Sequence, residues 1–235
     1  MKRELVVRRT GGAAGRRVGL GVAFALLACV AVLGQQAQRF AQAQQENARQ
    51  LRQYSWQSRR EIRKGGETKS VQLYSVRHDV DGTPQQTQIG GTPPQQIPTH
   101  GLRGLMAKKK KEDFIELLEG LGALAKAYGE LAPDKLQRFM AGATVTPEMD
   151  ARQSLVRIEG GGVLQPGDVM TVWVDAATRR QRRVEILTTY DRKPVRIVSE
   201  FQDLPGGPSY TARAVVDYPS QELVITTDNF GHARD

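Results

Sequence analysis

The sequence predicts an α+β fold in which a strongly curved antiparallel β-sheet, a half-barrel, is covered by a helical lid. Short β-rich runs follow one another closely over residues 153–230, with turn residues between them. These links are too short to hold a crossover helix, so the neighbouring strands must be antiparallel. An apolar stripe at helical spacing precedes the runs and offers the sheet an apolar cover.

Residues 1–43 have the order of a secretory leader. A basic segment, 1–17, precedes a run of apolar and glycine residues, 18–33, and the chain then becomes rich in glutamine. Three fates remain open: cleavage after Ala41-Gln42-Ala43, which we favour, retention as an inner-membrane anchor, or lipidation at Cys29 in a lipobox-like segment. Each fate places the rest of the chain, 44–235, in the periplasm or cell envelope.

The distribution of charge argues against nucleic-acid binding. The chain has 34 Lys and Arg residues, 25 Asp and Glu residues and a net charge of +9. Seven of the basic residues and one of the acidic residues lie in residues 1–43, which leaves a net charge of +3 on the remainder. Most of the excess positive charge therefore belongs to the predicted leader and not to a surface that binds nucleic acid. Cys29 is the single cysteine, so a mature chain has no disulfide and depends on its core.

The first half of the domain is predicted to hold one helix and two strands. Residues 44–53 form a polar helix, and residues 54–63 and 70–77 alternate as strands around a Gly65-Gly66 turn. Residues 90–107, rich in Gly, Pro, Gln and Thr at their start, are predicted as a flexible loop. The lysines 108–111 are then predicted to lie in water at the start of the following helix, or else to contact anionic lipid head groups.

The lid is predicted over residues 112–140. Apolar residues of Glu112–Leu131 recur at three- and four-residue steps, which indicates a helix with one apolar face. Glycines at 120, 122 and 129 weaken this helix, so we expect close approach to a neighbour there. Residues 134–140 form a second short helix, and residues 144–150 are a polar link to the strands.

The C-terminal meander contains six predicted strands, so we expect about seven or eight strands in all. They are Leu155–Glu159, Val169–Asp175, Arg183–Tyr190, Val195–Phe201, Tyr210–Tyr218 and Leu223–Phe230. Most have one apolar and one mixed face, which is typical of a sheet with water on one side. Val169–Val174 is apolar on both faces, so we place this strand at the centre of the sheet.

The order of these parts resembles that of the periplasmic outer-membrane lipoprotein carrier and sorting family. The resemblance rests on Val172-Trp173-Val174-Asp175, the turn at 176–179, the strands 184–190 and 195–201, and the ending Asp228-Asn229-Phe230-Gly231. It covers roughly residues 47–230. The resemblance implies a half-barrel whose concave apolar face, under a helical lid, holds acyl chains.

The sequence offers no motif for catalysis or for a cofactor. His78, His100 and His232 lie in a predicted turn, loop and tail, and the spacings of H-E-x-x-H, G-x-S-x-G, C-x-x-C and the P-loop are absent. The basic cluster at 179–183 is read as a solvated hairpin tip, with an anionic partner as the alternative. We therefore expect a protein that is not an enzyme and that holds no cofactor and no metal.

These observations favour a cell-envelope protein that binds an apolar ligand, such as a lipid or a lipid-anchored protein. The candidate groove residues are Trp56, Ile62, Leu117, Leu121, Met170, Val172, Val184 and Ile186. Each of them also fits a simple core position, because burial stabilises an apolar side chain in either role. The alternative is a membrane-anchored structural or interaction module with a fully packed core. An apolar cavity beneath the Glu112–Leu131 helix favours the first hypothesis, and a polar cavity or none favours the second.

Overall fold

The computed structural model describes residues 42–93, 101–150 and 153–234. The apolar run of the predicted leader, Cys29 and Ala41 lie outside the described residues, as do residues 94–100 of the predicted loop. Among the helices in the described part of the chain, none is long and apolar enough to cross a membrane.

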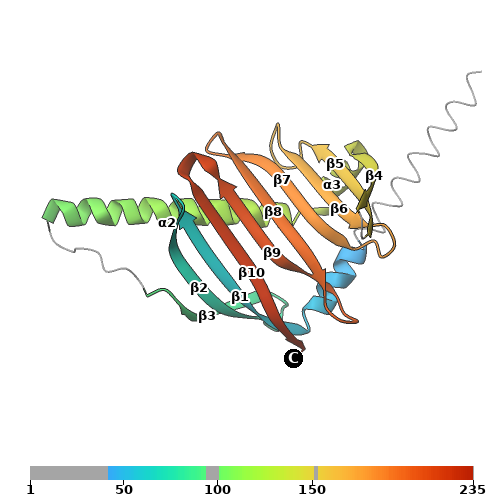
Figure 1. Cartoon of the computed structure of the whole chain (residues 1–235), viewed down its shortest axis with the longest axis horizontal. Coiled ribbons are helices and arrows are strands. Elements are labelled where there is room, and N and C mark those ends of the chain that lie inside the picture. The colour runs from blue at the N-terminus through green and yellow to red at the C-terminus, as the bar shows by residue number, and fades with distance from the viewer. Residues whose placement is uncertain (1–41, 94–100, 151–152, 235) are drawn as a thin grey trace, which may run out of the picture.

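Ten antiparallel strands of the described residues form one open sheet. They are β1 (Tyr54–Lys64), β2 (Glu67–His78), β3 (Pro84–Gly91), β4 (Thr144–Asp150), β5 (Gln153–Gly161), β6 (Val169–Asp175), β7 (Gln181–Tyr190), β8 (Lys193–Asp203), β9 (Ser209–Tyr218) and β10 (Leu223–Arg234). Their order is β3-β2-β1-β10-β9-β8-β7-β6-β5-β4, so the first and last strands of the chain are neighbours (Figure 1). The α+β half-barrel is thereby confirmed, and all six strands predicted in the meander are present.

Two strands were missed by the sequence analysis, and both lie at the edges of the sheet. The strand β3 covers residues 84–89, which no predicted element included, and the first two residues of the predicted loop, and every one of its residues is exposed. Because neither face is buried, no apolar alternation marks it. The strand β4 forms where a polar link was predicted, and it contains Pro147, which an edge strand tolerates.

The placement of β6 at the centre of the sheet was wrong, because β6 is third from the β4 edge. Trp173 of β6 points away from the helices and is covered by side chains of neighbouring strands, not by a further layer of helices or strands. The guanidinium of Arg183 lies 5.6 Å from the centre of the Trp173 ring, and the Trp173 indole donates a 3.1 Å hydrogen bond to Glu148. Apolar residues on both faces of a strand therefore do not require a central position.

Two long helical elements cover the concave face: α2 (Gly101–Gly129) and α3 (Pro133–Gly142). A helical segment at 42–51 leads into β1, as predicted. In Figure 1, α2 lies behind the sheet and crosses the strands, and its N-terminal end projects past β2 and β3. The helix begins at Gly101 and not at Glu112, so part of the predicted loop is helical and Lys108–Lys111 lie inside the helix.

The core lies between the concave face and these helices. Cross-strand pairing places apolar residues of six strands in one row, which runs Ile62, Ile225, Val216, Ile197, Ile186 and Met170. Leu121 of α2 packs into this core and is fully buried. The close approach predicted for the helix glycines occurs at Gly120, where an added Cβ would lie 1.9 Å from the Tyr190 hydroxyl oxygen. No described residue lies within 4 Å of the same position on Gly122 or Gly129.

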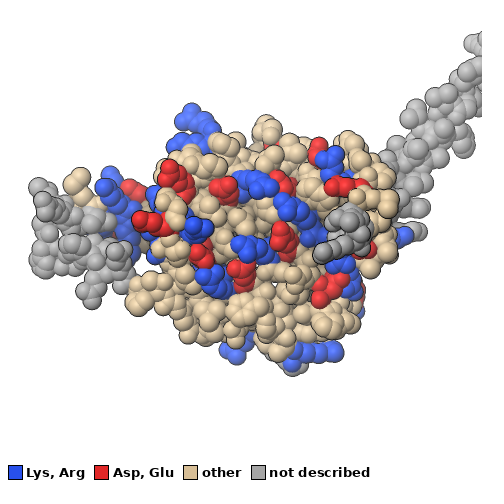
Figure 2. Space-filling model, in the orientation of Figure 1, with Lys and Arg blue, Asp and Glu red and all other residues tan. Residues whose placement is uncertain are grey.

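The opposite, convex face is charged and solvated. Figure 2 shows Lys and Arg side chains interspersed with Asp and Glu side chains across the middle of this face. Several pair between strands: Glu185 accepts from Arg196 at 2.8 Å and from Arg183 at 3.0 Å, and Asp228 lies 3.4 Å from Arg213. Such exposed pairs each contribute roughly 0–1 kcal/mol, so this face serves solubility more than stability.

Candidate ligand cavity

A cavity of about 320 Å³ lies between the concave face of the sheet and the corner where α2 passes into α3. Its volume is at the low end of the ~300–1,000 Å³ that is usual for ligand sites. The floor is formed by β5–β9, and the roof by the last turns of α2, the link to α3 and α3 itself. The lining residues are Gln44, Ala125, Tyr128, Gly129, Glu130, Leu131, Leu136, Phe139, Met140, Ile158, Met170, Val172, Gln181, Val184, Ile186, Ile197, Ser199, Phe201 and Thr211.

Tyr128 adds a buried polar link between the roof and the sheet. The hydroxyl of Tyr128 donates a 2.7 Å hydrogen bond to Asp168 Oδ2, and it lies 2.8 Å from Thr188 Oγ1. Because the single tyrosine proton goes to the carboxylate, the Thr188 hydroxyl donates to the tyrosine oxygen. All three residues are buried, so these bonds are shielded from water.

Asp168 also organises the loop that precedes β6. Its carboxylate accepts hydrogen bonds from the backbone N–H groups of Val163, Leu164 and Gln165 at 2.7–2.9 Å. Burial alone would raise the pKa of Asp168, but these bonds and that of Tyr128 outweigh it and lower the pKa. Burial raises the pKa of Tyr128, and Asp168 raises it further. The pair therefore stays as a neutral phenol beside a carboxylate at neutral pH.

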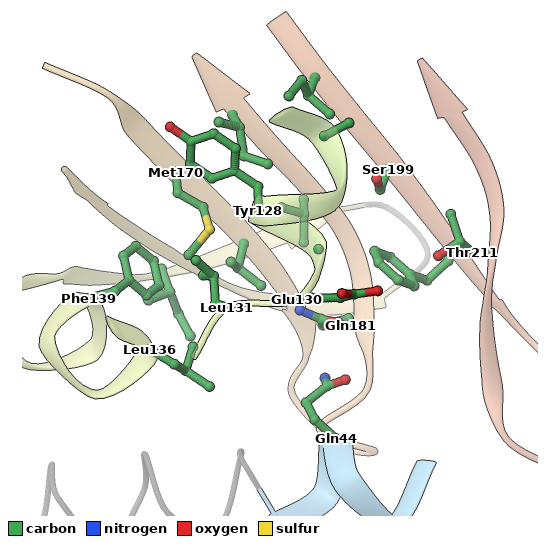
Figure 3. Close-up of a pocket in the computed structure, with 18 of the residues that line it drawn as sticks. Gln44, Tyr128, Glu130, Leu131, Leu136, Phe139, Met170, Gln181, Ser199 and Thr211 are labelled. Carbon is green, nitrogen blue, oxygen red and sulfur yellow. The ribbon is translucent and has the colours of Figure 1, made fainter. Parts of the chain in front are cut away.

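The cavity has apolar walls and a polar mouth. In Figure 3, Leu131, Leu136, Phe139 and Met170 lie together on one side, whereas Glu130, Gln181 and Gln44 lie toward the helical segment 42–51. A second hollow of about 230 Å³ adjoins the mouth and shares Gln44, Gln181 and Phe201 with the cavity. An elongated molecule could therefore place an apolar part inside and a polar part outside.

The helical segment 42–51 borders this mouth, and Asn47 joins the segment to β9. The Asn47 amide donates a 2.8 Å hydrogen bond to the Ser209 carbonyl and accepts one of 2.6 Å from the Ser209 N–H. On the other side of the second hollow lies the β6–β7 hairpin with Arg179 and Arg180. Arg180 pairs with Asp203 at 3.1 Å. Arg179 has no ion pair with any residue that the structure describes.

The eight predicted groove residues fall into three groups. Met170, Val172, Val184 and Ile186 line the cavity. Ile62, Leu117 and Leu121 pack in the core without lining it. Trp56 lies on β1, where its ring contacts His78 and stacks on His232, with ring centres 5.4 and 5.7 Å apart.

Sequence reasoning missed the roof corner and the mouth. Leu136, Phe139 and Met140 were recognised as apolar positions of the second lid helix, and that signal could have assigned them to the groove. Gln44 and Gln181 carry no such signal, because isolated glutamines in polar segments are common on any surface. Within the described residues, no group of three or more His, Cys, Asp or Glu side chains is placed to hold a metal ion.

No protein-family model matches the sequence, and no curated protein matches it. Solved structures similar to this chain include a DUF1329 family protein from Desulfovibrio piger (12% identity, TM-score 0.41, covering 88% of this chain and 93% of that one). A second is a LolA superfamily protein from Nitrosomonas europaea (10% identity, TM-score 0.37, covering 81% of this chain and 93% of that one). A third is a domain from Vibrio parahaemolyticus named for outer membrane lipoprotein sorting (12% identity, TM-score 0.38, covering 85% of this chain and 93% of that one). TM-scores of this size carry no inference about ligand or partner, and the fold described above rests on the strand order of this chain.

Proposed function

We propose that this protein binds an amphiphile in the cavity, with an apolar chain such as a lipid acyl chain inside and the polar end at the mouth. The cavity carries this proposal, because it is apolar where it is deepest and polar where it opens. The predicted leader places this binding in the periplasm or cell envelope, where the amphiphile is a lipid or the anchor of a lipid-anchored protein.

A packed core offers a poor explanation of the same space. Protein interiors are filled to the density of organic crystals, and empty volume costs about 24 cal/mol per Å³. A space of about 320 Å³ is too large for an ordinary packing defect of such an interior. Water is a poor occupant of the deep end, because Phe139, Met170 and Val172 offer it no hydrogen-bond partner.

The cavity also fits one chain better than a bulky ligand. Its floor is formed by side chains of alternating positions on β5–β9, and Tyr128 and Phe139 close it from above. The way out leads past Gln44 and Gln181 into the second hollow, where amide groups and Arg179 can hydrogen-bond an ester, amide or acidic head group. The polar end of the ligand would thus remain close to water.

The test is a titration of the protein, purified after expression of the full chain, with the fluorescent fatty acid cis-parinaric acid. Val184→Phe places a larger ring in the cavity, and Val156→Phe makes the same change at a half-buried core valine that does not line it. We expect Val184→Phe to weaken binding at least about tenfold and Val156→Phe to leave it near that of the wild type. Equal binding by all three proteins, or no binding by the wild type, would refute the proposal and favour the interaction module.

A further inference from the structure

We infer that the projecting N-terminal part of α2 docks on the surface of a membrane that contains anionic lipids. This surface, the lysine collar, is formed by Lys108, Lys109, Lys110 and Lys111, with Met106 two residues before it. The inference is independent of the cavity and would stand if the cavity held no ligand.

The lysine collar lies where α2 has left the sheet. The stripe that packs against the core begins at Phe114 and continues through Leu117 and Leu121. Lys108 to Asp113 are all exposed, and Met106 exposes 66% of its surface. At ~1.5 Å per residue, the part of α2 before Phe114 is about 20 Å long. Figure 1 shows this part extending beyond β2 and β3.

The lysines of the collar repel one another. Residues three and four positions apart are neighbours on a helix surface, and like charges there destabilise the helix. Lys108 and Lys111 are such a pair, and the first turn of α2 contains no acidic residue. An external anionic surface would compensate the mutual repulsion of the lysines.

The lysine collar is also largely without partners in the molecule. Lys108 lies 3.8 Å from Glu112, and the other three lysines have no ion pair with any described residue. The convex face differs, because its arginines pair with carboxylates of adjacent strands. The lysine collar therefore differs from the convex face, where positive and negative side chains pair with one another.

The geometry fits a flat anionic surface better than a shaped protein groove. Successive residues of a helix are ~100° apart, so four consecutive lysines surround the axis and some face any plane that the projecting end meets. Lysine binds as a point charge on a flexible stem, which suits mobile phosphate head groups. An exposed Met106 adds an apolar contact for the interface of a bilayer.

The experiment is sedimentation of the protein with vesicles of phosphatidylcholine alone and of an equal mixture with phosphatidylglycerol. Lys109→Ala, Lys110→Ala and Lys111→Ala are combined in one variant, which keeps good helix formers in α2. The control combines Lys69→Ala, Arg138→Ala and Lys193→Ala, which removes the same charge from three other elements. The leader is common to all of these proteins, so any contribution it makes cancels.

We expect the wild type and the control to partition onto the mixed vesicles more strongly than onto phosphatidylcholine, and high salt to abolish the difference. The collar variant should partition about 100-fold more weakly, since each lysine near an anionic surface contributes roughly a factor of five. Binding of cis-parinaric acid should be unchanged in it. Equal loss in the control, or no loss in the collar variant, would overturn the inference. So would tighter binding of duplex DNA that depends on the same lysines, because the collar would then be a nucleic-acid site.

Discussion

The hydroxyl of Tyr128 donates a 2.7 Å hydrogen bond to the carboxylate of Asp168 and so joins the last turns of α2 to the loop before β6. Asp168 is bound in turn by three backbone N–H groups of that loop, which fix its orientation. The contact lies at the wall of the cavity, where the lid meets the sheet. This buried pair therefore links the cavity roof to the sheet beside the apolar contacts of Leu121 and Phe139.

Replacing this tyrosine should loosen the roof. Tyr128→Phe removes the bond to Asp168 and leaves the buried Thr188 hydroxyl without its partner, so we expect the free energy of unfolding to fall by about 1–3 kcal/mol. Urea denaturation measures this change. Tyr210→Phe removes a hydroxyl that bonds the Gln202 side chain at 3.2 Å near the surface, and it should cost much less. Equal costs would show that the buried pair has no special role.

The same pair predicts a dependence of stability on pH. The folded-state pKa of Asp168 is lowered, so its carboxylate stabilises the fold above its unfolded pKa of about 3.9. That contribution is lost as the pH falls through the lowered folded value. Urea titrations from pH 7 to pH 3 measure the free energy of unfolding of the wild type and of Asp168→Asn. We expect the difference between the two proteins to become smaller as the pH falls. Asp113→Asn removes a carboxylate from an exposed part of α2 and serves as the control for the loss of one negative charge. A difference between wild type and Asp168→Asn that stays constant with pH would contradict the prediction.

The close approach of Gly120 to Tyr190 gives a matched pair of glycine substitutions. Gly120→Ala introduces a Cβ 1.9 Å from the Tyr190 hydroxyl oxygen, and the Tyr190 ring is held edge-on against Tyr218. We expect a loss of about 1–3 kcal/mol from overpacking. Gly122→Ala meets nothing within 4 Å and should gain about 0.5–1 kcal/mol from helix propensity. Thermal unfolding distinguishes the two, and gains of similar size would disprove the steric contact.

Tyr190→Leu should partly rescue Gly120→Ala, because the shorter side chain does not reach the helix. A double-mutant cycle with Tyr190→Leu alone measures this coupling. Additive costs would mean that the alanine acts on the helix itself and not on the tyrosine.

Much of the fold could be predicted because most strands carry their own signals. Most of the strands β5–β10 alternate apolar and polar residues, β6 is apolar on both faces, and turn residues separate them all, so each appears in the structure near its predicted bounds. The strands β3 and β4 carry no burial pattern, since pairing with one neighbour, and not a buried face, holds them in the sheet. The extra turns of α2 were missed because the lysine collar interrupts the apolar stripe, whereas periodicity detects only faces that are buried.

The candidate cavity was half predictable for a related reason. Alternation on β7 identifies Val184 and Ile186 as inward residues, and these line the cavity together with Met170 and Val172 of the apolar strand β6. The same pattern on β1 selects Ile62, which packs in the core instead, because periodicity gives the face of a residue and not its distance from the lid. The mouth depends on the contact between the segment 42–51 and β9, which joins residues 162 positions apart in the chain.

The hydrogen bonds between Asn47 and Ser209 lead to a prediction about ligand exchange. If the helical segment 42–51 closes the mouth, Asn47→Ala should raise the dissociation rate of cis-parinaric acid about tenfold, because opening no longer breaks the two bonds to the Ser209 backbone. Stopped-flow displacement by excess oleic acid measures this rate. Arg49→Ala lies on the same segment and removes only an exposed pair with Glu46, so its rate should match that of the wild type. An unchanged rate in Asn47→Ala would mean that the ligand leaves by another route, and a rise in both variants would point to fraying of the segment as a whole.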